Sequence, residues 1–178
     1  MPPLPLFFYL LLMAVATYFL LNGWLWGAGY EPTKKSVRQK IIGLLEERLS
    51  ADRFVLYDLG SGCGGVLIDV AERFPNALCT GIEADPLKCA IARWRVRKLG
   101  LQHHLMITRG NLLKTDLSDA DIVYMFLSPL ILTKQEFRDK IKKLKPECLI
   151  VSYCHRILGV EPAAVIGKDL FVYLRSLF

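Results

Sequence analysis

A glycine-rich segment at residues 54–65 constrains this chain more than any other part of its sequence. The segment reads FVLYDLGSGCGG, and a second apolar run follows directly. This order is typical of a buried parallel strand, a tight turn and the first turn of a helix. Glycine permits backbone angles that other residues resist, and it lets a ligand approach the main chain closely. We therefore expect a ligand site at the carboxyl end of the strand, beside the N-terminus of the helix.

Two classes of ligand fit this turn. Gly60, Gly62 and Gly65 satisfy the G-x-G-x-x-G pattern of dinucleotide-binding proteins. The run from Asp58 to Gly64 equally satisfies the acidic D-x-G-x-G-x-G pattern of class I S-adenosylmethionine (SAM) methyltransferases. A carboxylate two positions before the first glycine repels a pyrophosphate but attracts the α-ammonium group of SAM. The sequence therefore favours SAM, and a glycine-rich turn that binds no ligand is the remaining alternative.

The first thirty residues carry no charged side chain, and they account for the high mean hydropathy of +0.32. As a helix, residues 4–26 would be ~35 Å long, against ~30 Å for a hydrocarbon core. Trp24 and Trp26 lie at the end of this segment, where aromatic residues meet lipid headgroups, and a basic segment at 34–40 follows. We predict a single transmembrane anchor over residues 4–26. The N-terminus would lie outside, with the catalytic domain on the cytoplasmic or mitochondrial matrix side.

A cleaved signal peptide and a helix buried in the soluble domain are the two alternatives to an anchor. Residues 14–16 read AVA and match a small-residue cleavage site, but the segment before them lacks the positive charge of a signal peptide.

The five cysteines indicate neither a disulfide framework nor a metal site. Their number is odd, no C-x-x-C pair occurs, and none has a histidine at ligand spacing. Cys79, Cys148 and Cys154 fall on predicted strands, so we expect core thiols, and we predict no bound metal.

Strand and helix patterns alternate through residues 31–178, which we predict to be one domain. This order predicts an α/β fold with a doubly wound, mostly parallel sheet, the Rossmann-like fold of class I methyltransferases. Strands are expected at 54–58, 78–83, 105–109, 122–127, 149–154 and 170–174, and helices at 34–49, 64–74, 86–99 and 133–144.

The predicted helix at 86–99 combines apolar and basic residues. Leu87, Ala90, Ile91 and Trp94 recur at helical spacing, which predicts its buried face. Its arginines and lysines are expected to form a solvated basic face, and contact with anionic lipid or an acidic partner is the alternative.

Further site residues are expected where strands end. Glu83 ends the second strand about twenty residues past the glycine turn, where an acid hydrogen-bonds ribose hydroxyls. Asn111 follows the third strand, and its side-chain oxygen can accept a hydrogen bond from an adenine amino group. After the fourth strand the chain reads FLSPL, whereas base-modifying amino-methyltransferases carry D/N-P-P-Y/F there. We therefore expect no nucleic-acid substrate.

The order of these motifs resembles one group, the seven-β-strand SAM-dependent protein-lysine methyltransferases. That group includes an archaeal broad-specificity enzyme and mitochondrial enzymes acting on ATP synthase subunit c and the adenine nucleotide translocase. Five motifs carry the resemblance, which spans roughly residues 30 to 173: Y-x-P-T at 30–33, VLYDLGSG at 55–62, GIE at 81–83, GN at 110–111 and MFL at 125–127.

The resemblance implies a lysine of a membrane-associated protein as methyl acceptor and SAM as cofactor. Cys63 and Gly65 stand where the family usually has Asp and Arg, and residues 152–155 and Val160 also depart from its pattern. The implied SAM contacts are Tyr30, Thr33, Asp58, Leu59, Gly60, Ser61, Gly62, Glu83 and Asn111.

The expected reaction is an in-line attack of a neutral lysine amine on the methyl group of the sulfonium. At a pKa of ~10.4, only ~0.1% of a free lysine is neutral near pH 7.4, so the site must desolvate the ammonium or accept its proton. Ser128 and Tyr153, at the ends of the fourth and fifth strands, are the candidate catalytic residues that steer the amine. A methyltransferase of a lipid-soluble small molecule and a non-catalytic SAM-binding module are the alternatives.

Overall fold

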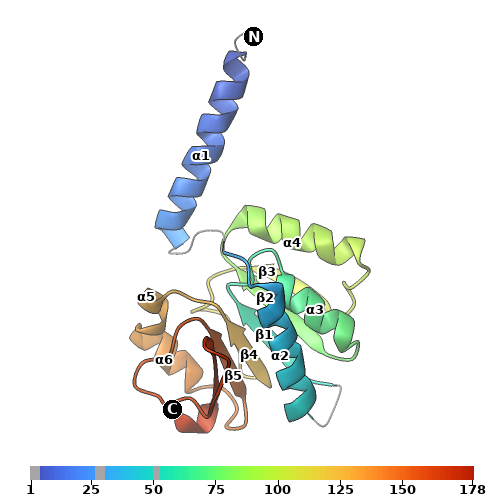
Figure 1. The fold of residues 1–178 in the computed structure, drawn as a ribbon, viewed down its shortest axis with the longest axis vertical. Helices are drawn as coiled ribbons and strands as arrows, with labels where there is room; N and C mark the ends of the chain where they lie inside the picture. The colour runs from blue at the N-terminus through green and yellow to red at the C-terminus, as the bar shows by residue number, and fades with distance from the viewer. Residues whose placement is uncertain (1–4, 27–30, 50–52) are drawn as a thin grey trace. The chain divides into compact units, whose positions relative to one another are not determined.

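The computed structural model describes residues 5–26, 31–49 and 53–178 (Figure 1). The chain divides into two compact units, Met1–Glu31 and Pro32–Phe178. The first unit holds a single helix, α1 (Leu6–Trp26). Within the described residues, none of the helices combines the length and the apolar composition that crossing a lipid bilayer requires. The predicted transmembrane helix over residues 4–26 is therefore not supported, although a helix does form there.

The second unit is built on a seven-stranded sheet with the order β3-β2-β1-β4-β5-β7-β6. The first five strands are parallel, β7 runs antiparallel to β5, and β6 runs antiparallel to β7. This arrangement confirms the predicted mostly parallel α/β sheet. The strands are β1 (Val55–Leu59), β2 (Leu78–Glu83), β3 (Leu105–Arg109), β4 (Ile122–Met125), β5 (Leu149–Tyr153), β6 (Ala164–Ile166) and β7 (Leu170–Leu174).

Helices cover both faces of this sheet (Figure 1). Apolar side chains of α2, α3 and α4 form one core cluster with the sheet. Side chains of α6 and the single buried leucine of α5 belong to a second cluster on the other face. The helices are α2 (Lys35–Arg48), α3 (Gly65–Arg73), α4 (Pro86–Lys98), α5 (Pro129–Leu132) and α6 (Gln135–Ile141), and a 3-10 helix, η1 (Arg175–Leu177), ends the chain.

Helix α4 packs on the face opposite to the predicted one. Its buried residues are Cys89, Ala92 and Val96. Leu87, Ile91 and Trp94 are instead exposed, as is Ala90. The small side chains allow close packing, because a Cβ on Gly64 would lie only 3.5 Å from the Cβ of Ala92. Helical spacing alone could not distinguish the two faces, since each carries apolar residues.

Two further predictions differ from the structure. The predicted helix at 133–144 is present only as the shorter α6, at 135–141. The short helix α5, at 129–132, and the short edge strand β6 were not predicted. Cys79 and Cys148 are buried as predicted, but Cys154 is exposed. Cys154 lies just past β5 with a φ of 70°, so the chain has already left the sheet at this residue.

The glycine turn packs directly against β2 because residue 81 has no side chain. Gly60 N and Ser61 N both donate to the carbonyl oxygen of Ile82, at 2.8 and 3.1 Å. A Cβ at Gly81 would lie 2.6 Å from Ser61 Oγ and 2.7 Å from Leu67 Cδ1. These distances are shorter than van der Waals contact, so a larger residue must displace the turn or α3.

We expect Gly81→Ala to lower the free energy of unfolding by ~1–3 kcal/mol, the usual range for overpacking a well-packed core. Chemical denaturation followed by circular dichroism measures this change. Gly43→Ala is the matched control, because Gly43 lies in α2 with no atom within 4 Å of the added methyl group. That variant should be more stable by ~0.5–1 kcal/mol. An unchanged denaturation midpoint for Gly81→Ala would contradict the packing described here.

Candidate functional site

The turn between β1 and α3 forms the centre of the candidate site. Gly60, Gly62 and Gly64 have φ angles of 84°, 54° and 75°, in the left-handed region that favours glycine. Gly64 is the N-cap residue of α3, so the turn leads straight into the N-terminus of that helix. The first amides of a helix have no carbonyl partner within the helix, and they can donate hydrogen bonds to a ligand.

Glu83 is hydrogen-bonded to this turn and to the segments that follow β2 and β3. Its side chain is buried at the end of β2. Oε2 accepts a hydrogen bond from Gly62 N at 2.7 Å, and Oε1 accepts one from Asp85 N at 2.9 Å. The carbonyl oxygen of Glu83 accepts a third bond from Gly110 N at 2.9 Å. Each carboxylate oxygen can accept a further bond, so Glu83 can hold ligand hydroxyls as well as the turn.

Asp58 lies on β1, where it is paired with Gly81 on β2 and Tyr124 on β4. Its side chain is only 2% exposed. Burial, followed by the charge of Glu83, raises the pKa of Asp58 well above its ordinary value. The folded chain therefore holds this proton more tightly than the unfolded chain. As the pH rises from the ordinary to the raised pKa, this group's contribution to stability falls. A cationic group beside Asp58 would oppose the shift, so the site is suited to an ammonium.

Tyr124 and Thr33 extend the same face of the sheet. The Tyr124 hydroxyl lies 3.0 Å from Thr33 Oγ1. Burial and the charge of Asp58 raise the pKa of Tyr124, so this phenol stays protonated. Arg38 holds the segment before α2, because its Nη1 donates to the carbonyl oxygen of Thr33 at 3.0 Å. Tyr124, which no sequence pattern indicated, is paired with Asp58 across the strands and bonds to Thr33, so it links these two predicted site residues.

Two arginines lie beside Cys63 and Gly65, the two turn residues that depart from the family pattern. Arg95 Nη1 donates to the carbonyl oxygen of Cys63 at 2.7 Å. Arg38 Nη1 lies 3.6 Å from the position that a Cβ on Gly65 would occupy, and Arg38 Nε donates to Asp69 Oδ2 at 2.7 Å. A guanidinium from α2 therefore lies beside Gly65, the position at which the resemblance described above implies an arginine.

Asn111 and Tyr30 were predicted to contact the cofactor. Asn111 is exposed in the loop after β3, and its Oδ1 accepts a hydrogen bond from Leu113 N at 2.9 Å. This oxygen can accept a second bond, so contact with an adenine amino group stays a prediction. Tyr30 lies outside the described residues.

Aromatic side chains end the neighbouring strands. Tyr153 is the last residue of β5, and Phe126 follows β4. Their ring centroids lie 4.7 Å apart at an interplanar angle of 57°. Ser128 caps α5 nearby in the sequence, and its buried Oγ makes no hydrogen bond within the described residues. Tyr153 thus ends its strand as predicted, whereas Ser128 lies three residues past the end of β4, at the start of α5. Phe126, which no sequence pattern indicated, lies between β4 and Ser128.

These groups suit a ligand with an ammonium and neighbouring hydroxyls. Asp58 can face the ammonium, Glu83 can accept hydroxyl donors, and the turn supplies main-chain amides. Ser61 Oγ is buried and has no hydrogen-bond partner in the described part of the chain, so it can bond to such a ligand. Among the same residues, no group of three or more His, Cys, Asp or Glu side chains could hold a metal ion.

Comparisons with known proteins agree with this geometry. Residues 58–164 match the family described as ANTKMT methyltransferase domain. The Protein-lysine N-methyltransferase of Saccharolobus islandicus (strain REY15A) is 32% identical over 141 residues, which cover 79% of this chain and 84% of that protein.

Solved structures give the same fold. An RNA methyltransferase from Salinibacter ruber, in complex with S-adenosyl-L-homocysteine, superposes with a TM-score of 0.73 at 27% identity and covers 81% of this chain and 93% of its own. A precorrin-6y C5,15-methyltransferase from Geobacter metallireducens has a TM-score of 0.59 at 27% identity, covering 70% of this chain and 65% of its own. S-adenosyl-L-homocysteine is SAM without its transferable methyl group. The chain belongs to the ANTKMT methyltransferase domain family and is a class I, Rossmann-like, SAM-dependent methyltransferase.

Proposed function

We propose that this enzyme methylates the ε-amine of lysine residues in proteins. The observation that carries the proposal is the 32% identity to the Saccharolobus enzyme, which extends over 84% of that protein. The segment after β4 adds support, because FLSPL lacks the D/N-P-P-Y/F pattern of base-modifying amino-methyltransferases.

The glycine turn and its acidic neighbours would hold SAM. Asp58 would face the α-ammonium, Glu83 the ribose hydroxyls, and the amides after Gly60 the amino-acid portion. When bound, SAM supplies a methyl group on a sulfonium that a nucleophile can displace. Glu83 already fixes the turn through Gly62, so the protein loses little freedom when the cofactor binds.

The residues after β4 and β5 would receive the lysine. An apolar surrounding lowers the pKa of an amine, which raises its neutral fraction. The rings of Phe126 and Tyr153 can provide such a surrounding, and aromatic faces also attract an ammonium before it loses its proton. The buried Ser128 Oγ can accept a hydrogen bond from the amine and orient it. Alignment of this kind supplies most of the rate expected for a displacement reaction.

The location of the protein is a separate proposal. We propose that the N-terminal segment holds the enzyme at a membrane, with the catalytic domain on the cytoplasmic or mitochondrial matrix side, and that the substrate protein is membrane-associated. The support is the lack of charged side chains in the first thirty residues and the basic segment at 34–40. In α1, the apolar residues 6–13 are exposed, and such a surface is stabilised by an apolar surrounding.

Glu83→Gln should weaken SAM binding by at least ~tenfold, because an amide cannot accept all the hydrogen bonds of a carboxylate and loses the charge that strengthens them. Isothermal titration calorimetry with SAM measures this change. Glu147→Gln is the control, because Glu147 is exposed in the loop before β5. Equal affinities for the Glu83→Gln variant and the wild type would refute the role given to Glu83.

SAM binding should also depend on pH through Asp58. Because its pKa is raised, a lower pH protonates Asp58 and removes the charge that attracts the ammonium. Affinity should therefore rise with pH through this pKa and then level off. Asp58→Asn should bind more weakly with a flat profile. Calorimetry at a series of pH values from the ordinary carboxyl pKa upwards, over the range in which both proteins stay folded, makes the comparison. A flat wild-type profile would show that Asp58 does not sense the ligand.

Methyl transfer itself should produce mono-, di- or trimethyl-lysine in proteins incubated with enzyme and isotope-labelled SAM, detected by peptide mass spectrometry. Ser128→Ala and Tyr153→Phe should each lower kcat by at least ~tenfold with SAM affinity unchanged, because they act on amine alignment. Tyr57→Phe is the control, because the Tyr57 hydroxyl bonds Asp119 in an exposed contact.

The acceptor classes and the location are separated in the same assay. RNA and lipid extracts are tested in parallel, and label found only there would overturn the lysine proposal. Full-length enzyme is compared with residues 31–178 on membrane and soluble proteins. Loss confined to membrane proteins supports the membrane location through effective concentration. Equal loss on both kinds of protein argues against that location.

A further inference from the structure

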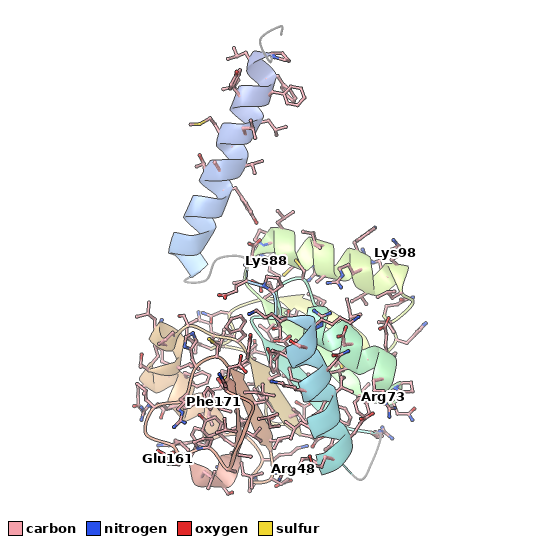
Figure 2. All side chains as sticks on the ribbon, viewed as in Figure 1. Arg48, Arg73, Lys88, Lys98, Glu161 and Phe171 are labelled. Atoms are coloured by element: carbon pink, nitrogen blue, oxygen red, sulfur yellow. The ribbon has the colours of Figure 1, made fainter. Side chains whose placement is uncertain are left out.

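Helix α4 has an apolar stripe on its outer face that the methyltransferase site does not use. Leu87, Ile91 and Trp94 are 47%, 38% and 59% exposed. Their spacing of four and three residues places them along one side of the helix, opposite the buried Cys89 and Val96. Figure 2 labels Lys88 and Lys98 at the two ends of this helix. The stripe therefore runs along most of α4 and is exposed in the described part of the chain.

Every charged residue of α4 is basic. Lys98 extends the apolar stripe by one turn, and its Nζ lies 5.2 Å from the centre of the Trp94 ring. Arg93 and Arg95 flank the stripe, and each donates to a main-chain carbonyl of the domain, at Ile107 and Cys63. Within the described residues, no ion pair involves α4. The basic residues are Lys88, Arg93, Arg95, Arg97 and Lys98.

We propose that the outer face of α4, made of Leu87, Ile91 and Trp94 with Arg97 and Lys98, docks onto the surface of an anionic lipid bilayer. An apolar stripe that contains Trp and lies between Lys and Arg residues is the pattern of helices that lie in the membrane interface. The apolar side chains enter the headgroup region, and the cations meet anionic lipid phosphates and carboxylates.

The aliphatic residues of the stripe, Leu87 and Ile91, favour lipid over nucleic acid as the partner of this surface. A single-stranded nucleic acid binds basic grooves in which aromatic rings stack on bases. Leu87 and Ile91 offer no stacking surface and no hydrogen bond, so they contribute little to such a site. In a bilayer interface the same two side chains leave water, which is favourable. A purely acidic protein surface would also leave this stripe without an apolar partner.

Docking at α4 would also affect access to the acceptor site. This consequence rests on the proposed function. The helix begins at Pro86, three residues after Glu83, so its N-terminal end lies at the carboxyl edge of the sheet, where the cofactor turn also lies. A bilayer that contacts α4 would bring this edge close to lysines that project from membrane proteins near the headgroups.

Fluorescence of Trp94 in the full chain tests the docking surface without any methyl transfer. Trp24, Trp26 and Trp94 are the only tryptophans in the sequence, so Trp24→Phe with Trp26→Phe leaves Trp94 as the single reporter. The chain is added to phosphatidylcholine vesicles with or without about one third phosphatidylserine, both containing brominated lipid. Binding through the apolar N-terminal segment occurs in both preparations, and substitutions on α4 separate its contribution from that of the basic segment at 34–40.

In anionic vesicles we expect a blue-shifted Trp94 emission and at least ~twofold more quenching by brominated lipid than in neutral vesicles, with a loss of both effects at high salt. Leu87→Ala should reduce the quenching, whereas Leu177→Ala should not. The two leucines are 47% and 48% exposed, so they are matched in exposure. Arg97→Glu should also reduce it, whereas Lys143→Glu, at an exposed lysine after α6, should leave it unchanged. Circular dichroism checks that each variant is folded.

The proposal is overturned if Trp94 remains as accessible to aqueous acrylamide in anionic vesicles as it is in buffer. It is also overturned if RNA or an acidic peptide shifts the Trp94 emission and anionic vesicles do not, because the surface then serves a different partner. A failure of the lysine-methylation assay leaves this measurement unaffected, since quenching depends only on where Trp94 lies.

Discussion

Two carboxylates, Asp58 and Glu83, lie buried at the same edge of the sheet, and the rest of the site is arranged around them. Burying two like charges is unfavourable unless hydrogen bonds or a cation compensate. Main-chain amides from Gly62 and Asp85 compensate Glu83, whereas burial and the charge of Glu83 raise the pKa of Asp58. Such an imbalance is typical of a group that meets its partner only when a ligand binds.

The fold could be predicted from the sequence because its signals are local. The glycine turn, the acidic residue before it and the alternation of apolar strands with helices each lie within a few residues of one another. The features that could not be predicted depend instead on packing between elements. The outward face of α4 and the short strand β6 depend on which neighbouring element each segment packs against, and hydrophobic spacing does not carry that information.

The site residues that could not be predicted from the sequence depend on strand register and on segments that are distant in the sequence. Tyr124 becomes part of the site only because β4 pairs with β1 so that Tyr124 lies opposite Asp58. Arg38 lies on α2 and contacts the turn beside Gly65, although the two residues are 27 positions apart in the sequence. The departures at Cys63 and Gly65 were visible in the sequence, but the arginines that lie beside them could be identified only in three dimensions.

The contact between Ser61 and Gly81 links two positions that are twenty residues apart. Because a side chain at 81 would overlap both Ser61 and Leu67, any residue larger than glycine there requires the turn or α3 to move, even where residue 61 is smaller. Residue 81 is therefore the constrained member of the pair, whereas residue 61 can change while residue 81 remains glycine. A comparison of related sequences should find glycine at 81 wherever residues 61 and 67 keep side chains of this size, and exchange at 81 only together with exchange at both.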